Sequence, residues 1–580
     1  MDKGRVERRA YIISDSIISP LGVGTEENMK RVMQYESGVK KIDDKTLFSN
    51  PFMAARIVDN SAIEKLENIP SDFTLLEKRI IAVVYNAASK IKLPDYDYKR
   101  FTANSQLIIA TTKGNIDLIA GRGENIDQRA FLGCSAKRVA ELLGMDREPI
   151  VISSACISGL NAIIEGARLI EGNICNNVIV VGADLLTRFV ITGFESFKSI
   201  SPNRCRPYDL SRDGLNLGEA VAALILSSNR EICRDFDPVI VEGGAVTNDA
   251  SHLSAPSRTG DGLGMAMIRA MEDACVSPEN VSFINAHGTS TQYNDEMESK
   301  AVHYASLQDI TVQSLKPFFG HTLGASGVVE SIASAWQMRN SFLFGTLGFK
   351  ELGVPMELKV TPNHRETPLY RCVKSASGFS GCNAAIVMAL ESSSIAKYSH
   401  KTSEWREISS YELKGKGDSD TVIRERYKEL EIKDIKFFKM DIMSRLGVIG
   451  ATTLLRGVEE ISDIDPFNIG FMLANRSSSL DTDIRHQIVI DEQGDTAASP
   501  AIFVYTLPNI VIGEISIRNK FKGENIFFVN SNERSESLCE DLLKMAERSR
   551  LEFVICGWCD YYNERYDLSF KLFKREIYGK

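Results

Sequence analysis

A repeated alternation of short β-branched runs with amphipathic helical stretches constrains the fold of this chain more than any other feature. The cycle runs through the first part of the sequence and begins again after about residue 240. The predicted elements are strands at 11–13, 107–110, 150–153 and 178–181 with helices over 74–91 and 160–170, then strands at 239–241 and 283–285 with helices over 264–275 and 324–338. Such alternation predicts a layered α/β fold with two related halves.

The pattern starts a third time after a change in composition. Residues 391–434 are rich in Ser, Lys and Glu and hold few apolar residues in register, as expected for a linker or an exposed helix. Beyond them the sequence predicts helices over 440–455 and 510–521, and strands at 468–474, 501–505 and 525–529. We therefore predict a first half at 1–245, a second half at 246–395, a linker at 396–436 and a further domain at 437–580.

The further domain reads as a repeat of the first half. Three stretches match in the same order, namely 76–88 with 440–452, 105–115 with 468–478, and 148–172 with 499–523. This alignment sets Leu507 opposite Cys156, and His486 is the only histidine in the region. The sequence therefore predicts a repetition of the fold without the thiol and its chemistry.

Composition and charge exclude several function classes. The 580 residues are 43% hydrophobic and 25% charged, as in ordinary globular proteins. A net charge of −9 argues against nucleic acid or an anionic membrane as the main partner. The charged segment Met1–Arg9 lacks the apolar core of a signal peptide, and no later run reaches the length of a membrane-spanning helix. We expect a cytoplasmic protein with no membrane partner.

The eleven cysteines are scattered and show no disulfide framework. Cys556 and Cys559 have the spacing of a redox motif or of half a zinc site. They follow the apolar stretch Phe553–Ile555, and no second Cys/His pair lies nearby. We interpret the pair as part of a buried strand and expect no metal site.

Cys156 stands where a β-type run meets a helical period, with apolar residues at 157, 160, 163, 164, 167 and 170. A thiol at such a turn faces unsatisfied backbone N–H groups and the positive end of the helix dipole. Both favour the thiolate, which is the nucleophilic form. A cysteine beside an apolar helix is nevertheless more often a core residue, so this signal is weak alone.

Three further segments strengthen the catalytic interpretation. His287 directly follows a predicted strand on a loop of small hydroxyl residues, with Asp295 and Glu298 downstream. His321 comes just before a Gly/Ala-rich helix. The turn Ser377–Asn383 is punctuated by glycines, which can bring backbone N–H groups close to a ligand.

These four segments, in this order, resemble the β-ketoacyl carrier-protein synthases of the elongating, decarboxylating type. The similarity covers about residues 9–392 and includes the stretches 206–219 and 248–256. It implies a thiolase fold, a layered αβαβα arrangement of two ββαβα-type halves, usually dimerised through the first half. The domain at 437–580 resembles a half-synthase without its thiol, like the chain-length factors that pair with active synthases.

The resemblance also implies roles for individual residues. Cys156 would carry the acyl group as a thioester, with an oxyanion hole from the backbone N–H groups of Cys156 and Phe379, beside Gly378. His287 and His321 would polarise the malonyl thioester carbonyl and stabilise the enolate formed when carbon dioxide leaves. The remaining assignments are Lys316, Glu330 and Glu298 as electrostatic and structural support, Thr289 and Thr291 as contacts of the phosphopantetheine arm, and Phe379 as a gate. Simple loop capping is an equally good interpretation of the two threonines.

The resemblance implies an acyltransferase whose substrates ride on the phosphopantetheine of acyl carrier protein, with no bound cofactor and no metal. Two alternatives stay open. One is a CoA-dependent, thiolase-type enzyme, which His321 disfavours because CoA-primed members generally carry Asn there and thiolases a second Cys. The other is a noncatalytic, chain-length-factor-like scaffold that binds acyl carrier protein. The pathway (fatty acid, polyketide or polyene) and the assembly (homodimer or pseudo-heterodimer) also stay open.

Two segments depart from the family pattern. The usual Gly-Phe-Gly-Gly-Thr-Asn loop reads Gly-Phe-Ser-Gly-Cys-Asn over 378–383, and Pro317, Phe318 and Phe319 replace small hydroxyl and Met types before His321. These changes bear on the flexibility of the gate and the shape of the acyl pocket, and they indicate a specialised member of the family.

Overall fold

The computed structural model describes residues 8–93, 95–121, 126–395 and 403–577. The sheet of the first half has the strand order β6-β5-β7-β9-β1. Strand β5 is parallel to β6 and β7, whereas β9 is antiparallel to both β7 and β1. These strands are β1 (Ala10–Ser19), β5 (Gln106–Ala110), β6 (Ile150–Ile152), β7 (Asn177–Asp184) and β9 (Ala220–Ser227).

The second half repeats this topology, as the sequence predicts. Its order is β12-β11-β16-β17-β10, with the same parallel and antiparallel pairs. The strands are β10 (Val239–Asn248), β11 (Phe283–Asn285), β12 (Thr311–Gln313), β16 (Arg371–Gly378) and β17 (Cys382–Leu390). The predicted boundary after residue 245 falls inside β10. The second half therefore begins at β10, the counterpart of β1.

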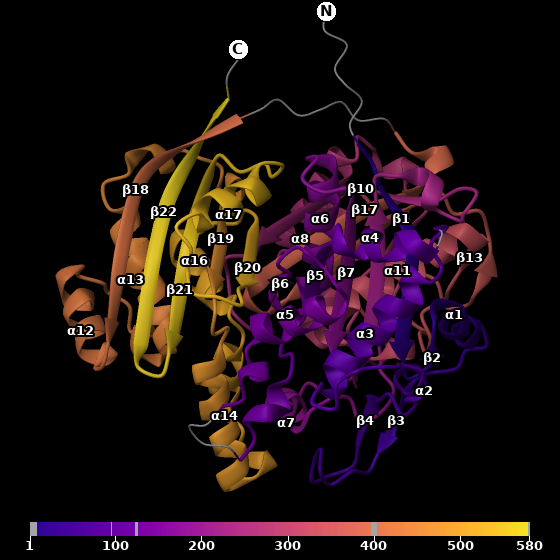
Figure 1. Cartoon of the computed structure of the whole chain (residues 1–580), viewed down its shortest axis with the longest axis horizontal. Helices are drawn as coiled ribbons and strands as arrows, with labels where there is room; N and C mark the ends of the chain where they lie inside the picture. The colour runs from indigo at the N-terminus through magenta and orange to yellow at the C-terminus, as the bar shows by residue number, and fades with distance from the viewer. Residues whose placement is uncertain (1–7, 94, 122–125, 396–402, 578–580) are drawn as a thin grey trace, which may run out of the picture.

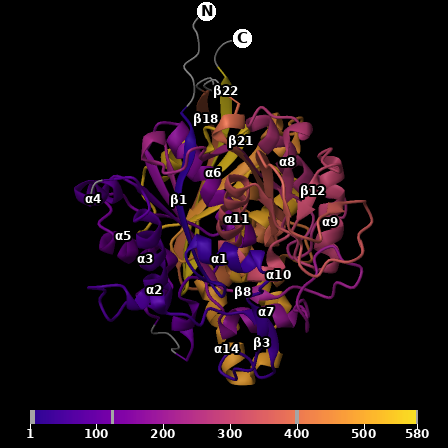
Figure 2. The same cartoon turned by 90° about the vertical axis from the view of Figure 1, so that its right-hand side faces the viewer.

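Helices complete the layers of the thiolase fold. Helices α6 (Ser158–Glu171) and α11 (Ser326–Asn340) pack against each other between the two sheets. Figure 2 shows this pair in the middle, with α3 (Leu75–Ala88) and α5 (Leu132–Leu142) on one side and α8 (Asp261–Asp273) and α9 (Gln292–Tyr304) on the other. Because α6 has protein on all sides, nearly every one of its residues is buried.

The C-terminal part of the chain contains the same topology a third time. Its order is β20-β19-β21-β22-β18, again with matching directions. The strands are β18 (Ser403–Lys416), β19 (Ile469–Asn475), β20 (Asn525–Val529), β21 (Phe553–Tyr562) and β22 (Arg565–Ile577). We call residues 403–577 the third unit.

The predicted linker at 396–436 is therefore largely wrong. Strand β18 and helix α12 (Ser419–Glu429) occupy most of it, and residues 396–402 lie outside the described residues. Strand β18 alternates half-buried and exposed positions because only one face packs on the unit. A half-polar strand of this kind has the composition of a linker, which explains the error.

The internal alignment is correct at two of its three points. Helix α13 (Ile442–Leu455) corresponds to α3, and β19 corresponds to β5. The segment 501–505, predicted as a strand, is instead helical, within α15 (Pro500–Phe503) and the short 3-10 turn after it. Its aromatic and β-branched residues suit a strand, but Pro500 starts a helix here. The counterpart of α5 is therefore α16 (Ile510–Asn519), and that of β6 is β20.

Strand register then gives a new counterpart for Cys156. Ile152 and Phe528 occupy equivalent strand positions and pair with each other across the two units. Cys156 lies four residues after Ile152, and Asn532 lies four residues after Phe528. The third unit thus lacks a cysteine at this distance from the matching strand, as predicted; the residue there is Asn532, whereas Leu507 comes before α16 and is not the counterpart of Cys156.

Strands β20 and β6 join the third unit to the first half. They run antiparallel, and the Ser153 N–H donates to the Phe527 carbonyl at 3.0 Å. In Figure 1 the strands of the third unit, from β18 to β20, lead directly to β6, β5 and β7 of the first half. The edge of the first sheet is therefore occupied by the chain itself.

A buried ion cluster reinforces this junction. The Arg168 guanidinium lies between Glu165 of its own helix, at 2.8 Å, and Glu524 of the third unit, with Nη2 3.0 Å from Glu524 Oε2. All three side chains are buried. An exposed pair, Arg550 with Glu272 at 2.6 Å, also bridges the third unit and the second half.

The interior of the third unit contains the Cys556/Cys559 pair. Both thiols are free and fully buried in β21, which confirms the buried-strand interpretation. Within the described residues no group of His, Cys, Asp and Glu side chains could hold a metal ion.

No single described helix is long and apolar enough to span a membrane. One sharply bent pair, Pro500–Thr506 with Ile510–Asn519, satisfies length and composition alone. The predicted charged N-terminus falls largely on residues 1–7, which lie outside the described residues.

Substitution of Arg168 by Ala is expected to lower the free energy of unfolding by about 3–5 kcal/mol, because it leaves two buried carboxylates without their cation. Arg550→Ala is the matched control and should cost less than about 1 kcal/mol, since its partner Glu272 is solvated. Urea denaturation of the whole chain measures both. Equal losses for the two variants would contradict the proposed importance of the buried cluster.

Candidate active site

Cys156 lies at the turn between β6 and α6, as predicted. Residues 155–157 form a short 3-10 turn, and Ala155 adopts a positive φ of 50°. The Ser158 hydroxyl donates to the Ala155 carbonyl at 2.6 Å and accepts the Ser154 N–H at 2.8 Å. This bonding fixes the turn, so the thiol is presented in one orientation.

The two predicted histidines meet at this thiol. His321 Nε2 is 3.1 Å from Cys156 Sγ, and its Nδ1 is 3.1 Å from the Ser326 hydroxyl. The His287 ring lies edge-on to the His321 ring, with centroids 5.1 Å apart. Because His287 follows β11 and His321 follows α10 (Lys316–Phe319), only the folded second half brings them together.

Glu298 holds the backbone that carries His287. Its carboxylate accepts the N–H groups of His287 and Gly288, at 2.8 and 2.6 Å. The Tyr208 hydroxyl donates to the same carboxylate at 3.0 Å. The predicted structural role of Glu298 thus has a direct basis in these contacts.

Glu330 lies between two lysines. It pairs with the predicted Lys316 and also with Lys374, whose Nζ is 2.6 Å from Glu330 Oε2. All three side chains are buried. Sequence analysis missed Lys374; a lysine inside the strand-like run Cys372–Ala376, between Val373 and the glycine-punctuated turn, was a usable signal.

Burial controls the protonation of the site. It raises the pKa of the Cys156 thiol to about 12, against a smaller lowering by Lys316. Burial, followed by the charge of Lys316, lowers the pKa of His287 and of His321 well below the ordinary value. Burial therefore opposes the predicted thiolate, because desolvation outweighs the favourable charge of Lys316. The site combines a neutral thiol with two neutral imidazoles.

The Gly378–Phe379 turn lies against Cys156. A Cβ atom on Gly378 would approach the Cys156 backbone nitrogen to 3.1 Å, so this glycine permits the close contact. Ser380, at the first departure from the family pattern, adopts a φ of 81°. The third unit restrains this gate loop, because the Ser380 hydroxyl donates to the Asn509 carbonyl at 3.0 Å and the Asn509 amide donates to the Phe379 carbonyl at 3.2 Å.

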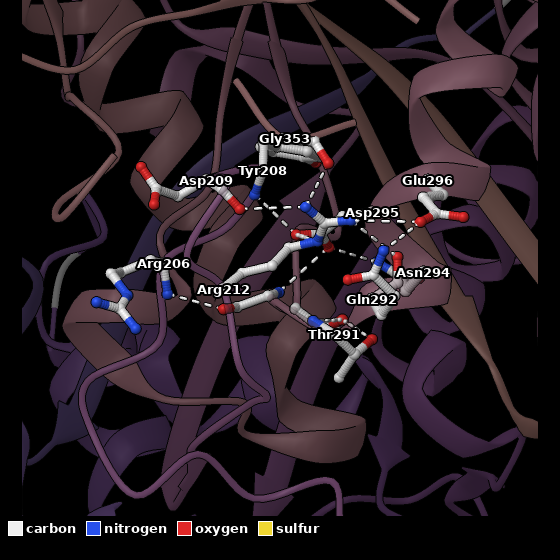
Figure 3. Close-up of polar contacts among 12 residues, drawn as sticks. Arg206, Tyr208, Asp209, Arg212, Thr291, Gln292, Asn294, Asp295, Glu296 and Gly353 are labelled. Atoms are coloured by element: carbon white, nitrogen blue, oxygen red, sulfur yellow. Dashed lines mark hydrogen bonds and ion pairs between the residues drawn. The ribbon is translucent and has the colours of Figure 1, made fainter. Parts of the chain in front are cut away.

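Arg212 anchors the loop that carries Thr289 and Thr291. Its buried guanidinium donates to the carbonyls of Gly353, at 2.5 Å, and Gln292, at 3.3 Å. Figure 3 shows these contacts together with Asp295, which accepts the backbone N–H of Tyr208 at 2.7 Å. These contacts hold the loop that carries Thr289 and Thr291 in place at the edge of the site.

A cavity of about 330 Å³ connects these groups. Its lining includes the predicted residues Cys156, His287, His321, Thr289, Thr291, Gly378 and Phe379. The two threonine hydroxyls lie 2.9 Å apart, so local loop bonding and ligand contact are both available to them. The structure thus brings together all ten predicted site residues, either on the cavity or, for Lys316, Glu298 and Glu330, behind it.

Aromatic side chains close one part of this cavity. Phe379 packs on Phe194 and Phe197 of α7 (Arg188–Ser196) and its end, with centroid distances of 6.1 and 5.5 Å. Phe503 of the third unit packs on Phe194 at 5.6 Å. His486 lies behind Phe503, with ring centroids 5.3 Å apart. The third unit therefore supports the aromatic wall from behind, since Phe194, Phe197 and Phe379 line the cavity and Phe503 packs on Phe194.

Alkylation by iodoacetamide is expected to be slow at Cys156 at neutral pH and to rise with pH beyond about pH 10, because the reactive thiolate forms only near the raised pKa. Exposed Cys275 is the internal control, and peptide mass spectrometry separates the two sites. A Cys156 rate that levels off near pH 8 would show instead that the helix terminus stabilises the thiolate.

Comparison with known proteins places these residues in a family. Residues 110–231 match the beta-ketoacyl synthase N-terminal domain, and residues 239–350 match the C-terminal domain. The 3-oxoacyl-[acyl-carrier-protein] synthase 2 of Vibrio harveyi is 27% identical over 66% of this chain and 98% of its own length. The enzyme of the same name from Staphylococcus aureus is 31% identical over 246 residues. This match covers 40% of the present chain and 61% of the relative.

A solved structure extends the likeness of fold to the third unit. The PfaC keto synthase-chain length factor matches 98% of this chain and 78% of its own, with a TM-score of 0.78 and 15% identity. At that identity the comparison concerns the fold alone. The family assignment rests on the matched domains: residues 110–231 and 239–350, which carry Cys156, His287 and His321, are the N- and C-terminal domains of the beta-ketoacyl synthase family.

Proposed function

We propose that this protein catalyses the decarboxylative condensation of a malonyl thioester with an acyl group bound to Cys156. The observation that carries the proposal is the approach of His321 Nε2 to Cys156 Sγ, at 3.1 Å, with His287 beside it on a shared cavity. A nucleophile and two neutral N–H donors suit a reaction whose charge develops on thioester oxygens.

The first step transfers the acyl group. The Cys156 sulfur attacks the acyl thioester while its proton moves to His321, the ring within hydrogen-bonding distance. The backbone N–H groups of Cys156 and Phe379 would stabilise the oxyanion, and the departing pantetheine sulfur takes the proton. Ser326 can bond either tautomer of His321, because a hydroxyl both donates and accepts.

The second step forms the new carbon–carbon bond. Cleavage of the bond to the malonyl carboxylate releases carbon dioxide, and its electron pair forms an enolate stabilised by the ring N–H groups of His287 and His321. The enolate carbon attacks the acyl carbonyl, the carbon–sulfur bond breaks, and the Cys156 thiolate that leaves takes one proton from solvent. Burial keeps both imidazoles neutral, so the donors are fixed before charge develops.

The substrates of this proposal ride on the phosphopantetheine of an acyl carrier protein in the cytoplasm, and the chain needs no resident cofactor. Thr289 and Thr291 offer hydroxyls at the cavity for the polar arm. Fatty acid, polyketide and polyene synthesis all use this chemistry.

The third unit takes the place of a second subunit in this proposal. The β6 edge of the first half, at which a second copy could pair, is occupied by β20. One chain thus forms a pseudo-dimer with a single thiol site, and Asn509 and Phe503 connect its noncatalytic part to the gate and the aromatic wall.

Incubation with acyl carrier proteins loaded with acyl chains of several lengths is expected to add one acyl mass to the intact protein and none to Cys156→Ala. Labelled malonyl carrier should then yield carbon dioxide and ketoacyl product. Absence of any adduct would favour the noncatalytic scaffold. An adduct without carbon dioxide release would favour a CoA-dependent, thiolase-type enzyme.

Replacement of Phe503 by Ala is expected to shift acyl preference toward longer chains, by about 0.8 kcal/mol for each methylene that the enlarged cavity buries. Competition between acyl carriers, read by intact-protein mass, measures the shift. Phe467→Ala is the control, because this phenylalanine of the third unit lies by Arg269, away from the aromatic wall. An unchanged preference in Phe503→Ala would remove the third unit from substrate selection.

A further inference from the structure

Lys374 is a buried cation that neither the family resemblance nor the motifs identify. It lies on β16, fully buried, in register with Asn285 of β11. Its Nζ lies close to three oxygen atoms: Glu330 Oε2 and the Ser375 carbonyl, each at 2.6 Å, and the Ala286 carbonyl at 3.4 Å. The Lys374 ammonium is therefore surrounded by one carboxylate and two backbone carbonyls.

This ammonium connects the supports of the catalytic groups. Ala286 directly precedes His287, so its carbonyl fixes the start of the histidine loop. Glu330 also pairs with Lys316, which begins the short helix before His321. Lys374 is therefore bonded to the backbone beside one histidine and to the carboxylate that anchors the segment of the other.

The charge balance depends on the same residue. Burial alone would raise the pKa of Glu330, but Lys316 and Lys374 hold it below the ordinary value. With Glu330 ionised, the group Lys316–Glu330–Lys374 carries a net charge of +1 behind the histidine pair. Without Lys374 that charge falls to zero. A fixed positive charge in a water-poor site favours a developing enolate more than the neutral ground state.

We propose that Lys374 is a positioning residue for the decarboxylation step: it holds His287 and Glu330 in place and supplies the positive charge that favours the enolate. The inference rests on the function proposed above. Acyl transfer to Cys156 depends on it less, because the oxyanion of that step would be held by the backbone N–H groups of Cys156 and Phe379, next to Gly378, which lies against Cys156.

The test uses the whole chain and two substitutions that differ in volume. Lys374→Met fills the space without charge, whereas Lys374→Ala leaves room for a small amine. Carbon dioxide release from a bacterial acyl carrier protein loaded with labelled malonate is expected to fall about 100-fold in both variants. Acylation of Cys156, read by intact-protein mass, should change by less than about threefold, since one positioned charge affects chiefly the step in which charge develops near it.

Methylammonium distinguishes a positioning role from general damage. It should restore carbon dioxide release in Lys374→Ala with saturation and leave Lys374→Met unchanged, because only the first variant has space for it. Lys359→Met is the control, since Lys359 pairs with an exposed carboxylate, Asp309, at the edge of the same sheet.

Each outcome decides one question. Loss of both steps in parallel, or the absence of rescue in Lys374→Ala, would make Lys374 merely structural and overturn the proposal. Full activity of Lys374→Met would overturn it as well, while leaving the proposed function intact. A wild-type protein that releases no carbon dioxide would overturn the proposed function and this inference with it.

Discussion

The antiparallel contact of β20 with β6 is the constraint on which the rest of the structure depends. Strand β6 is only three residues long and lies at the edge of its sheet, so its backbone groups need a partner. The third unit supplies it, and the next residues, Ser153 and Ser154, bond to Phe527. Because these residues lead directly into the turn of Cys156, the junction that joins the third unit to the first half also fixes the nucleophile.

Burial gives the site its chemical character. In water, a cysteine at a helix terminus beside a lysine would be expected to ionise, but here desolvation keeps the proton on sulfur. The same burial keeps both imidazoles neutral, while Lys316, Glu330 and Lys374 place a fixed positive charge behind them. The site therefore depends on preorganised donors and charge, and proton transfer occurs only when substrate arrives.

The three copies of one topology contribute different residues to the site. The first provides the thiol, the second provides both histidines and their carboxylate supports, and the third provides no cysteine after its matching strand but contributes the aromatic contact of Phe503. Helix α17 (Leu538–Ala546) is less buried than its counterpart in the first copy. It buries only Leu538, Leu542 and Ala546, along one face, whereas its counterpart α6 is buried all round.

The sequence by itself determined the layered α/β class, the two related halves, the turn at Cys156 and the residues that would meet there, because these depend on hydrophobic periodicity and on motifs whose spacing is local. Tertiary structure decided the rest. The segment 501–505 has the composition of a strand and becomes helical against α7, and β18 looks like a linker because one of its faces meets solvent. The protonation of Cys156 and the role of Lys374 were also beyond the sequence. Both depend on which charges and carbonyls burial brings together from distant elements, and that proximity exists only in the folded chain.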